Sequence, residues 1–430
     1  MPLILPSRRT FCTRAILALL GAPTVLRAAT GIQTAQPHLN PIHPNVASID
    51  HDRILAAANA LLDTPPTPLT TFHSPHSPAT PNDFYSEPDD LAAPSSPAFT
   101  AHRDALFTLS RTVATLTAAS VLTQTTQPDP RYATHAADHL RAWFLTPATR
   151  MNPNLQYGQR TPKASPGHFN GNFKGLVETI PLAEVAQSIP FLASSSALTP
   201  DELSTLRAWF ADYLKWLTED PLATLARDQK DHHGSSWLLQ SAACAHLTAT
   251  GLTSDDSNLN LLRHRFRTVT LRAQLHATGK FPNEVATPNP YRNSLFNLDL
   301  LSAACDLLST RFESVWDYEL QDGPGMRTAI AFHAPFIANR SSWPYPADAA
   351  HFTDLPGRRI SLLLAGRAYS YPQYTEEWQS LPPIPDTAPA EIRRSDPLSQ
   401  PLLWVTHPKP VPLTSSVRSA SNHPQHRHRG

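Results

Sequence analysis

The chain has 430 residues, 41% of them hydrophobic and 16% charged, so it is long enough to bury one large core or two ordinary ones and is not disordered throughout. Its 35 basic and 35 acidic residues cancel, and no stripe of Lys or Arg stands out, which argues against a nucleic-acid-binding protein. An anionic ligand would have to be attracted by a local site, because the field of the whole molecule is close to neutral.

The N-terminus has the order of features found in an export signal. Ser-Arg-Arg-Thr-Phe at 7–11 precedes an apolar stretch from Ala15 to Leu26 and two small alanines, which predicts a twin-arginine signal peptide over 1–29. The alternative is an uncleaved membrane anchor, but the stretch is shorter than the roughly 20 residues of a spanning helix, and Pro23 interrupts it. We expect no later membrane span and predict a periplasmic or secreted protein.

The rest of the chain divides into an arm, a helical domain and a tail. Residues 30–98 are rich in Pro, Thr, Ser and His, and they contain one segment with helical apolar spacing, 52–62. Residues 99–395 contain nine such segments: 105–123, 131–143, 175–191, 199–216, 236–248, 258–275, 294–308, 326–336 and 360–367. Strand-like alternation is scarce, so we predict an all-α domain of antiparallel helix pairs, either closed as a toroid or open as a solenoid. Residues 396–430 are predicted to be disordered.

The cysteines give no metal framework. Cys12 falls in the predicted signal, which leaves Cys244 and Cys305 to form one disulfide in an oxidising compartment or to stay as free buried thiols. No Cys-x-x-Cys pair occurs, and the histidines of the tail have no spacing or acidic partner that fixes a metal geometry. We therefore predict neither a metal nor another cofactor.

Three segments between predicted helices are unusually polar: 151–174, 230–237 and 281–297. Mixed amide and aromatic side chains suit the hydroxyls and ring faces of sugars. The candidate sugar-binding residues of the first segment are Tyr157, Gln159, Arg160, Asn170, Asn172 and Lys174.

The second and third segments carry the candidates for proton transfer. His232 and His233 are adjacent and follow Asp231, which is a candidate substrate ligand as well as a helix cap. Tyr291 and Arg292 could supply an acid and a cation to a cleft, with Asn293 as a further substrate ligand.

These segments, in this order, resemble the alginate lyase family of polysaccharide lyases from about Asp83 to Gln379. The resemblance is carried by FTAHR at 99–103, LRAWFLTPATRMNPN at 140–154, YGQ at 157–159, HGS at 233–235 and YRNSLFNL at 291–298. It implies an (α/α) toroid with a cleft across one end and metal-independent β-elimination on an acidic, uronic-acid-containing polysaccharide.

β-Elimination explains why such a site needs these residue types. Removing the C5 proton beside a carboxylate is difficult unless the enzyme neutralises that carboxylate, positions a base and protonates the leaving oxygen. In the family these roles fall to an Asn-His pair and to an Arg followed by a Tyr. His233 matches the histidine, His232 replaces the asparagine, and Thr287 and Asn293 occupy the arginine and tyrosine positions.

The substitutions leave alternatives open. In one interpretation the site is rebuilt, with His232 or Arg292 neutralising the carboxylate, His233 as base and Tyr291 as acid. In another, the protein keeps a sugar cleft without catalysis, and the histidines only cap and pack a helix start. A third hypothesis is an inverting glycoside hydrolase that uses Asp231 and Glu284, although no motif supports it.

Overall fold

Five central helices contact one another in chain order in this computed structural model, which describes residues 45–89, 97–124, 127–161, 170–249, 257–310, 312–321 and 323–408. They are α3 (Ala101–Thr123), α5 (Pro181–Ser194), α8 (His232–Thr248), α12 (Pro290–Leu308) and α14 (Ile360–Ala368). Most of their residues are buried, including polar ones, as expected for helices that are covered on nearly every side.

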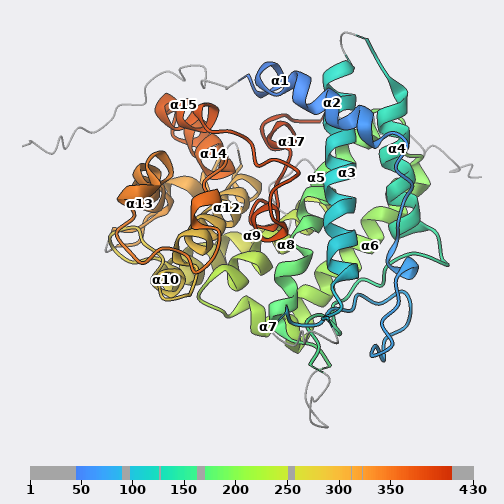
Figure 1. Ribbon diagram of the computed structural model, residues 1–430, viewed down its shortest axis with the longest axis horizontal. Helices are drawn as coiled ribbons and strands as arrows, with labels where there is room; N and C mark the ends of the chain where they lie inside the picture. Colours follow the sequence, from blue (N-terminus) through green and yellow to red (C-terminus); the bar gives the residue numbers. More distant parts are fainter. Residues whose placement is uncertain are drawn as a thin grey trace, which may run out of the picture. The chain divides into compact units, whose positions relative to one another are not determined.

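Further helices pack against this central series. α2 (His51–Leu61) and α4 (Pro130–Leu140) both contact α3. Figure 1 shows α3 and α4 side by side. α6 (Pro200–Glu219), α7 (Pro221–Arg227) and α9 (Ser257–Arg265) contact α8, whereas α13 (Met326–Ala338) and α15 (Pro372–Ser380) contact α14. Central helices paired with outer ones are the arrangement of an (α/α) toroid, which confirms the predicted fold class.

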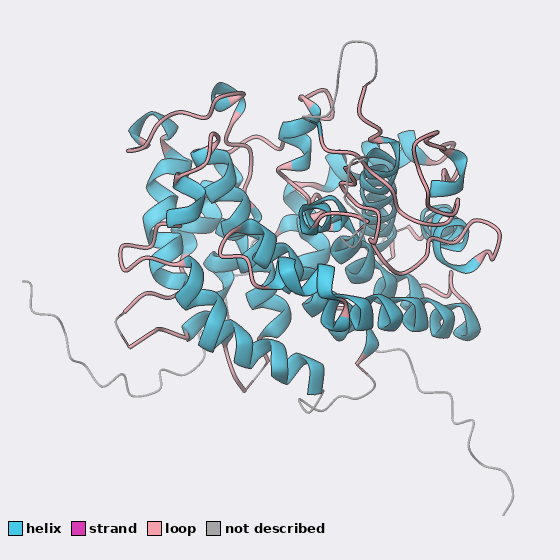
Figure 2. Ribbon diagram, turned by 90° about the horizontal axis from the view of Figure 1, so that it is seen from below, coloured by secondary structure: helices cyan, strands magenta, loops and turns pink. Residues whose placement is uncertain are grey.

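The shorter helices are α1 (Val46–Ile49), α10 (Leu271–Gln274), α11 (Pro282–Val285), α16 (Ala390–Arg394) and α17 (Pro401–Val405). Within the described ranges no strand forms, as Figure 2 shows, and only two isolated bridges occur, Tyr85 with Tyr157 and Glu319 with Gly325.

All ten predicted helical segments are found, but several begin earlier than predicted. α8 begins at His232 instead of Ser236, and α12 begins at Pro290 instead of Ser294. The first turns of these helices are rich in capping and polar residues, so apolar spacing alone does not include them. The predicted helix 258–275 is divided by a π-helical turn at Phe266–Thr270.

Two helical stretches correct the expectation that no later segment is apolar enough to span a membrane. Among the described residues, α3 and the stretch Phe173–Ser194 are long and apolar enough by length and composition alone. Because 67% and 78% of their most apolar windows are buried within the protein, both are accounted for as core helices. The predicted signal peptide at 1–29 lies outside the described residues.

The two cysteines of the helical region are not paired with each other. Cys244 on α8 and Cys305 on α12 are both free and buried, so the alternative of a disulfide between them is wrong. Burial in apolar surroundings raises the pKa of both thiols, which keeps them in the uncharged form.

The predicted disordered tail begins too early. Residues 396–408 are ordered: α17 contacts α3 and α5, and Leu398, Leu402, Leu403 and Trp404 are buried. Prolines and polar residues lie between these apolar residues, so the composition of the segment resembles that of a disordered tail. Residues 409–430 lie outside the described part of the chain.

A buried carboxylate on α5 anchors this C-terminal segment. Oε1 of Glu184 accepts a hydrogen bond from the backbone N–H of Gln400 at 2.8 Å, and Oε2 accepts one from the Ser399 hydroxyl at 3.0 Å. Burial raises the pKa of Glu184 from 4.5 to about 7, although these two bonds oppose the shift. The anchor therefore titrates near neutral pH.

We expect this anchor to make the stability of the protein depend on pH. Between about pH 4.5 and pH 7 the folded chain binds more protons than the unfolded chain, so the free energy of unfolding falls as the pH rises through this range. Glu184→Gln should remove the contribution of this carboxyl group to the pH dependence and raise the free energy of unfolding at high pH by roughly 1 kcal/mol. The gain is smaller than the full pKa shift implies because an amide weakens the two charge-assisted hydrogen bonds.

Urea unfolding on both sides of this pH range measures the effect. Glu219→Gln, on the exposed end of α6, is the matched control and should follow the wild type. A Glu184→Gln variant whose stability varies with pH in parallel with the wild type would contradict the assignment.

Candidate active site

The helix start of α8 places two histidines side by side. Asp231 is the N-cap residue, and its Oδ1 accepts a hydrogen bond from the backbone N–H of His233 at 3.0 Å. Gly234 allows the backbone of Gln229, in the loop before α8, to lie close to the first turn of the helix. A Cβ at position 234 would lie 2.3 Å from the carbonyl oxygen of Gln229. The imidazole centroids of His232 and His233 lie 4.3 Å apart, with a 31° angle between the rings.

His232 is held by a fully buried carboxylate. Oε1 of Glu284, on α11, accepts a hydrogen bond from the backbone N–H of His232 at 2.6 Å. Oε2 of the same carboxylate lies 3.0 Å from Nδ1 of the His232 ring. Burial alone would lower the pKa of His232, but the bond to Glu284 and the charges of Glu284 and Asp231 outweigh it, so the pKa is raised above 6.5. His232 is therefore biased toward the imidazolium.

His233 has the opposite bias. Its Nδ1 lies 3.0 Å from Oδ1 of Asp231, which fixes the ring and favours a proton on Nδ1. Burial lowers the pKa of His233 below 6.5; the bond to Asp231 opposes the shift and the adjacent His232 adds to it. With Nδ1 protonated and the ring neutral, Nε2 carries the lone pair that a general base needs.

Both histidines line a cavity of about 230 Å³. Its other lining residues are Arg103, Phe107, Gln159, Lys174, Val177, Glu178, Pro181, Arg394 and Pro397. Three of these side chains carry permanent positive charge and one is a carboxyl group, although carboxylates outside the lining pair with both arginines. The lining thus gathers cations in one place although the whole chain has a net charge of zero.

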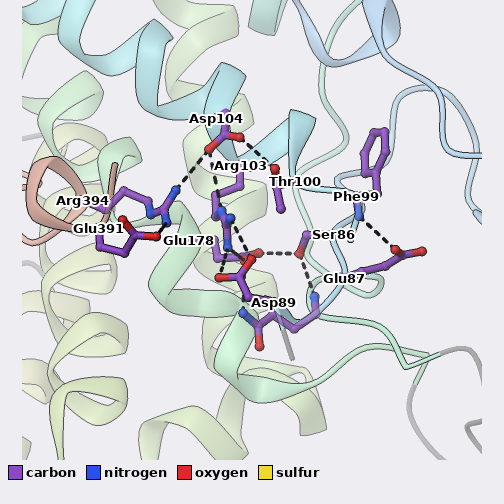
Figure 3. A network of polar contacts seen from close by, with 11 residues as sticks. Ser86, Glu87, Asp89, Phe99, Thr100, Arg103, Asp104, Glu178, Glu391 and Arg394 are labelled. Atoms are coloured by element: carbon purple, nitrogen blue, oxygen red, sulfur yellow. Dashed lines mark hydrogen bonds and ion pairs between the residues drawn. The ribbon is translucent and has the colours of Figure 1, made fainter. Parts of the chain in front are cut away.

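The carboxyl group of Glu178 organises one wall of the cavity (Figure 3). It accepts hydrogen bonds from the Ser86 hydroxyl, from Nε2 of Gln159 at 3.1 Å and from Nη1 of Arg103 at 3.3 Å. Burial raises the pKa of Glu178, although these three partners oppose the shift. Glu178 thereby fixes two cavity residues, Gln159 and Arg103.

Ligand atoms of Asp231, His232 and His233 lie within 4.8 Å of one another, close enough to raise the question of a metal ion. The Nδ1 atoms of both rings already face carboxylates, and Oδ1 of Asp231 also accepts the backbone N–H of His233. Lys174 and two arginines of the lining also repel a dication. The arrangement suits a pair of proton-transfer groups better than a metal site.

Four of the residues predicted from the sequence meet in this cavity. They are His232, His233, Gln159 and Lys174. Asp231 lies behind them as the partner of His233, and Asn172 caps the backbone N–H of Lys174 at 3.1 Å. These two act on the site through the residues that they hold.

The other predicted residues do not line the cavity. Tyr157 is paired with Tyr85 through a backbone bridge, the backbone N–H of Arg160 donates to the Ser86 carbonyl at 2.8 Å, and Asn170 is exposed. Nδ2 of Asn293 donates to the Thr287 hydroxyl at 3.1 Å. The side chains of Asn293 and Thr287 are therefore bonded to each other.

Tyr291 and Arg292 are corrections to the predicted catalytic set. The ring of Tyr291 is fully buried between Trp343 and Phe352, and its hydroxyl donates to the carbonyl of Phe336 at 2.8 Å. Burial raises the pKa of this phenol, which makes it a poor acid as well as an inaccessible one. Arg292 is absent from the lining, and its backbone N–H is bound by Asp348 at 3.0 Å.

Three residues of the site have roles that the sequence did not predict. Glu178 was not distinguished from an ordinary glutamate near a helix start, and Glu284 was considered only as a carboxylate of the hydrolase alternative, since their burial is a property of the packed structure. Arg394 had no signal in the sequence, because nothing in its surroundings on α16 marks it as part of a cavity.

Comparisons with known proteins agree with this fold. The alginate lyase family model matches residues 51–343, which is more than half of the chain. An alginate lyase from Bacteroides ovatus is similar at a TM-score of 0.69 with 22% identity, covering 84% of this chain and 94% of that one. Alginate lyase A1-III from Sphingomonas species A1 is similar at a TM-score of 0.50 with 14% identity, covering 82% and 95%. A comparison with curated proteins gave no match. The chain therefore belongs to the alginate lyase family.

Proposed function

We propose that this protein is a polysaccharide lyase that cleaves a uronic-acid-containing polysaccharide, alginate or a related polyuronate, by β-elimination. The observation that carries the proposal is the histidine pair in the cavity: each imidazole is held by its own carboxylate, the Glu284 charge raises the pKa of His232, and burial lowers that of His233. Groups whose environments push their pKa values apart are the expected acid and base of an active site.

His232 is proposed to neutralise the uronate carboxylate. As an imidazolium it places a positive charge where negative charge develops when the C5 proton leaves, which lowers the cost of the carbanion-like transition state. The family asparagine can offer only a neutral donor at this position, whereas His232 offers a charge supported by Glu284. Lys174, in the same lining, adds positive charge nearby.

His233 is proposed to be the base. Its Nε2 takes the proton from C5, the electrons of that C–H bond form the C4–C5 double bond, and the C4–O bond breaks. The leaving oxygen then receives the proton that His233 carries. We assign this proton transfer to His233 and not to Glu178, the carboxyl group among the cavity residues. Glu178 already accepts hydrogen bonds from Ser86, Gln159 and Arg103.

The glycoside hydrolase alternative has no support in this geometry. Asp231 and Glu284 were its candidate carboxylates, but each already holds a histidine, and Glu284 has no exposed surface from which to reach a sugar. The two carboxylates orient imidazoles instead of facing a glycosidic bond from either side.

Ultraviolet absorbance tests the proposal. We expect the purified protein to generate the absorbance of an unsaturated uronate with at least one of polymannuronate, polyguluronate and polyglucuronate, each supplied separately. Silence on all three polymers, while the protein still binds one of them, would contradict catalysis and leave a sugar-binding protein.

We also propose that the protein acts outside the cytoplasm after twin-arginine export. The support is the Arg8-Arg9 pair followed by the apolar stretch Ala15 to Leu26. N-terminal sequencing of protein recovered from the periplasm should show a chain that begins near residue 30. Recovery of the uncleaved chain from the cytoplasm alone would contradict export.

A further inference from the structure

Arg394 enters the cavity from outside the part of the chain that matches the family model. It is the last residue of α16, whereas the match ends at residue 343. The segment that carries it is firmly placed: Glu184 holds Ser399 and Gln400, Nε2 of Gln400 donates to the Thr115 hydroxyl at 2.7 Å, and Nη2 of Arg359 donates to the Ser395 carbonyl at 3.1 Å. Arg394 is thus presented to the cavity by a buried scaffold.

The contacts within the cavity separate two groups of lining residues. The histidine pair is bonded to Asp231 and Glu284, whereas Arg103 and Arg394 share Asp104 as a partner, at 3.8 Å and 3.4 Å (Figure 3). Among the described residues, no hydrogen bond or ion pair joins the first group to the second. The arginine pair therefore forms a second polar region of the same cavity.

The two arginines differ in how well they are paired. Arg103 donates hydrogen bonds to both carboxylate oxygens of Asp89, at 3.1 and 3.2 Å, and another to Glu178. Within the described part of the chain, the polar contacts of Arg394 are long, 3.4 Å to Asp104 and 3.6 Å to Glu391, and both partner side chains are about half exposed. A guanidinium offers five donors, so Arg394 retains unused capacity for a carboxylate.

We propose that Arg394 binds the carboxylate of a second uronate residue of the same polymer while the first lies at the histidine pair. The inference rests on the proposed function. It is supported by the cavity position of the guanidinium, its weak internal pairing and the neighbouring positive charge of Arg103. Arg394 thereby selects chains that carry more than one uronate, without taking part in proton transfer.

Arg394→Gln tests the proposal, with Arg394→Lys as the conservative variant. Arg393→Gln is the matched control, because Arg393 lies on the same helix, does not line the cavity and donates to the Ala388 carbonyl. We expect Arg394→Gln to raise KM for a polyuronate about tenfold with kcat nearly unchanged, since a charged hydrogen-bond donor to the substrate is lost. The KM of Arg394→Lys should lie between those of the wild type and Arg394→Gln, because lysine keeps the positive charge but lacks the planar guanidinium.

Affinity electrophoresis in gels that contain the same polyuronate separates this inference from the proposed function. If the wild type produces no unsaturated product but Arg394→Gln is retarded less than Arg393→Gln, the lyase proposal fails and the binding role of Arg394 stands. Equal retardation, or equal KM values in active protein, overturns the role of Arg394. Should Arg394→Gln fail to fold, the comparison of Arg394→Lys with Arg393→Gln decides by the same criteria.

Discussion

His233→Ala is expected to lower kcat for polyuronate cleavage about a thousandfold, the contribution typical of a positioned general base. The alanine removes the Nε2 lone pair that faces the cavity and leaves Asp231 in place as the N-cap of α8, so the helix start should persist. Binding of the polymer should be nearly unchanged, because Arg103, Lys174 and Arg394 remain in the lining. The initial rate of ultraviolet absorbance and the retardation in affinity gels measure the two effects separately.

An exposed histidine provides the control for this change. His51 lies on α2 with about half of its side chain exposed and does not line the cavity, so His51→Ala should keep wild-type kinetics. Full lyase activity in His233→Ala would show that the base is elsewhere. Loss of both activity and binding, with the fold intact, would show that His233 is a binding residue and not the base.

Glu284→Gln is expected to lower kcat at neutral pH by roughly one to two orders of magnitude. The change keeps the shape of the side chain but removes the charge that raises the pKa of His232 above 6.5. Burial then dominates, the pKa of His232 falls, and less imidazolium remains at neutral pH. The mechanism therefore loses the positive charge that neutralises the uronate carboxylate.

The dependence of kcat on pH distinguishes this explanation from a simple loss of stability. Because His233 must be neutral and His232 charged, the wild type should give a bell-shaped profile that rises with deprotonation of His233 and falls with deprotonation of His232. Glu284→Gln should move the falling limb to lower pH and leave the rising limb nearly in place. Glu219→Gln is the surface control, and a Glu284→Gln profile of unchanged shape would contradict the role of His232.

The helices were predictable from the sequence because their signal is local. Segments such as 199–216 and 326–336 repeat apolar residues on one helical face, and that face is what the core buries. The starts of α8 and α12 were missed because their first turns contain histidines, a proline and polar residues. The ordered segment 396–408 was missed because its order depends on buried contacts with α3 and α5.

The site was predictable only in part. His232, His233, Gln159 and Lys174 meet in one cavity, and they came from segments whose polar residues had no evident structural use. Tyr291 came from such a segment too, but it follows Pro290 in the first turn of α12 and faces the core, which no local pattern revealed. The partner that raises the pKa of His232 is distant in sequence, since Glu284 lies 52 residues away, whereas Asp231, the partner of His233, is only two residues away.

The masses of the products test the central claim most directly. β-Elimination cleaves the polymer without adding water and leaves an unsaturated residue at each new non-reducing end. Mass spectrometry of a polyuronate digest should therefore show oligosaccharides that are lighter by one water molecule than the saturated series, and His233→Ala should yield none. A saturated series, with one water added at each cleavage, would contradict the lyase mechanism and show that the cleavage is hydrolytic.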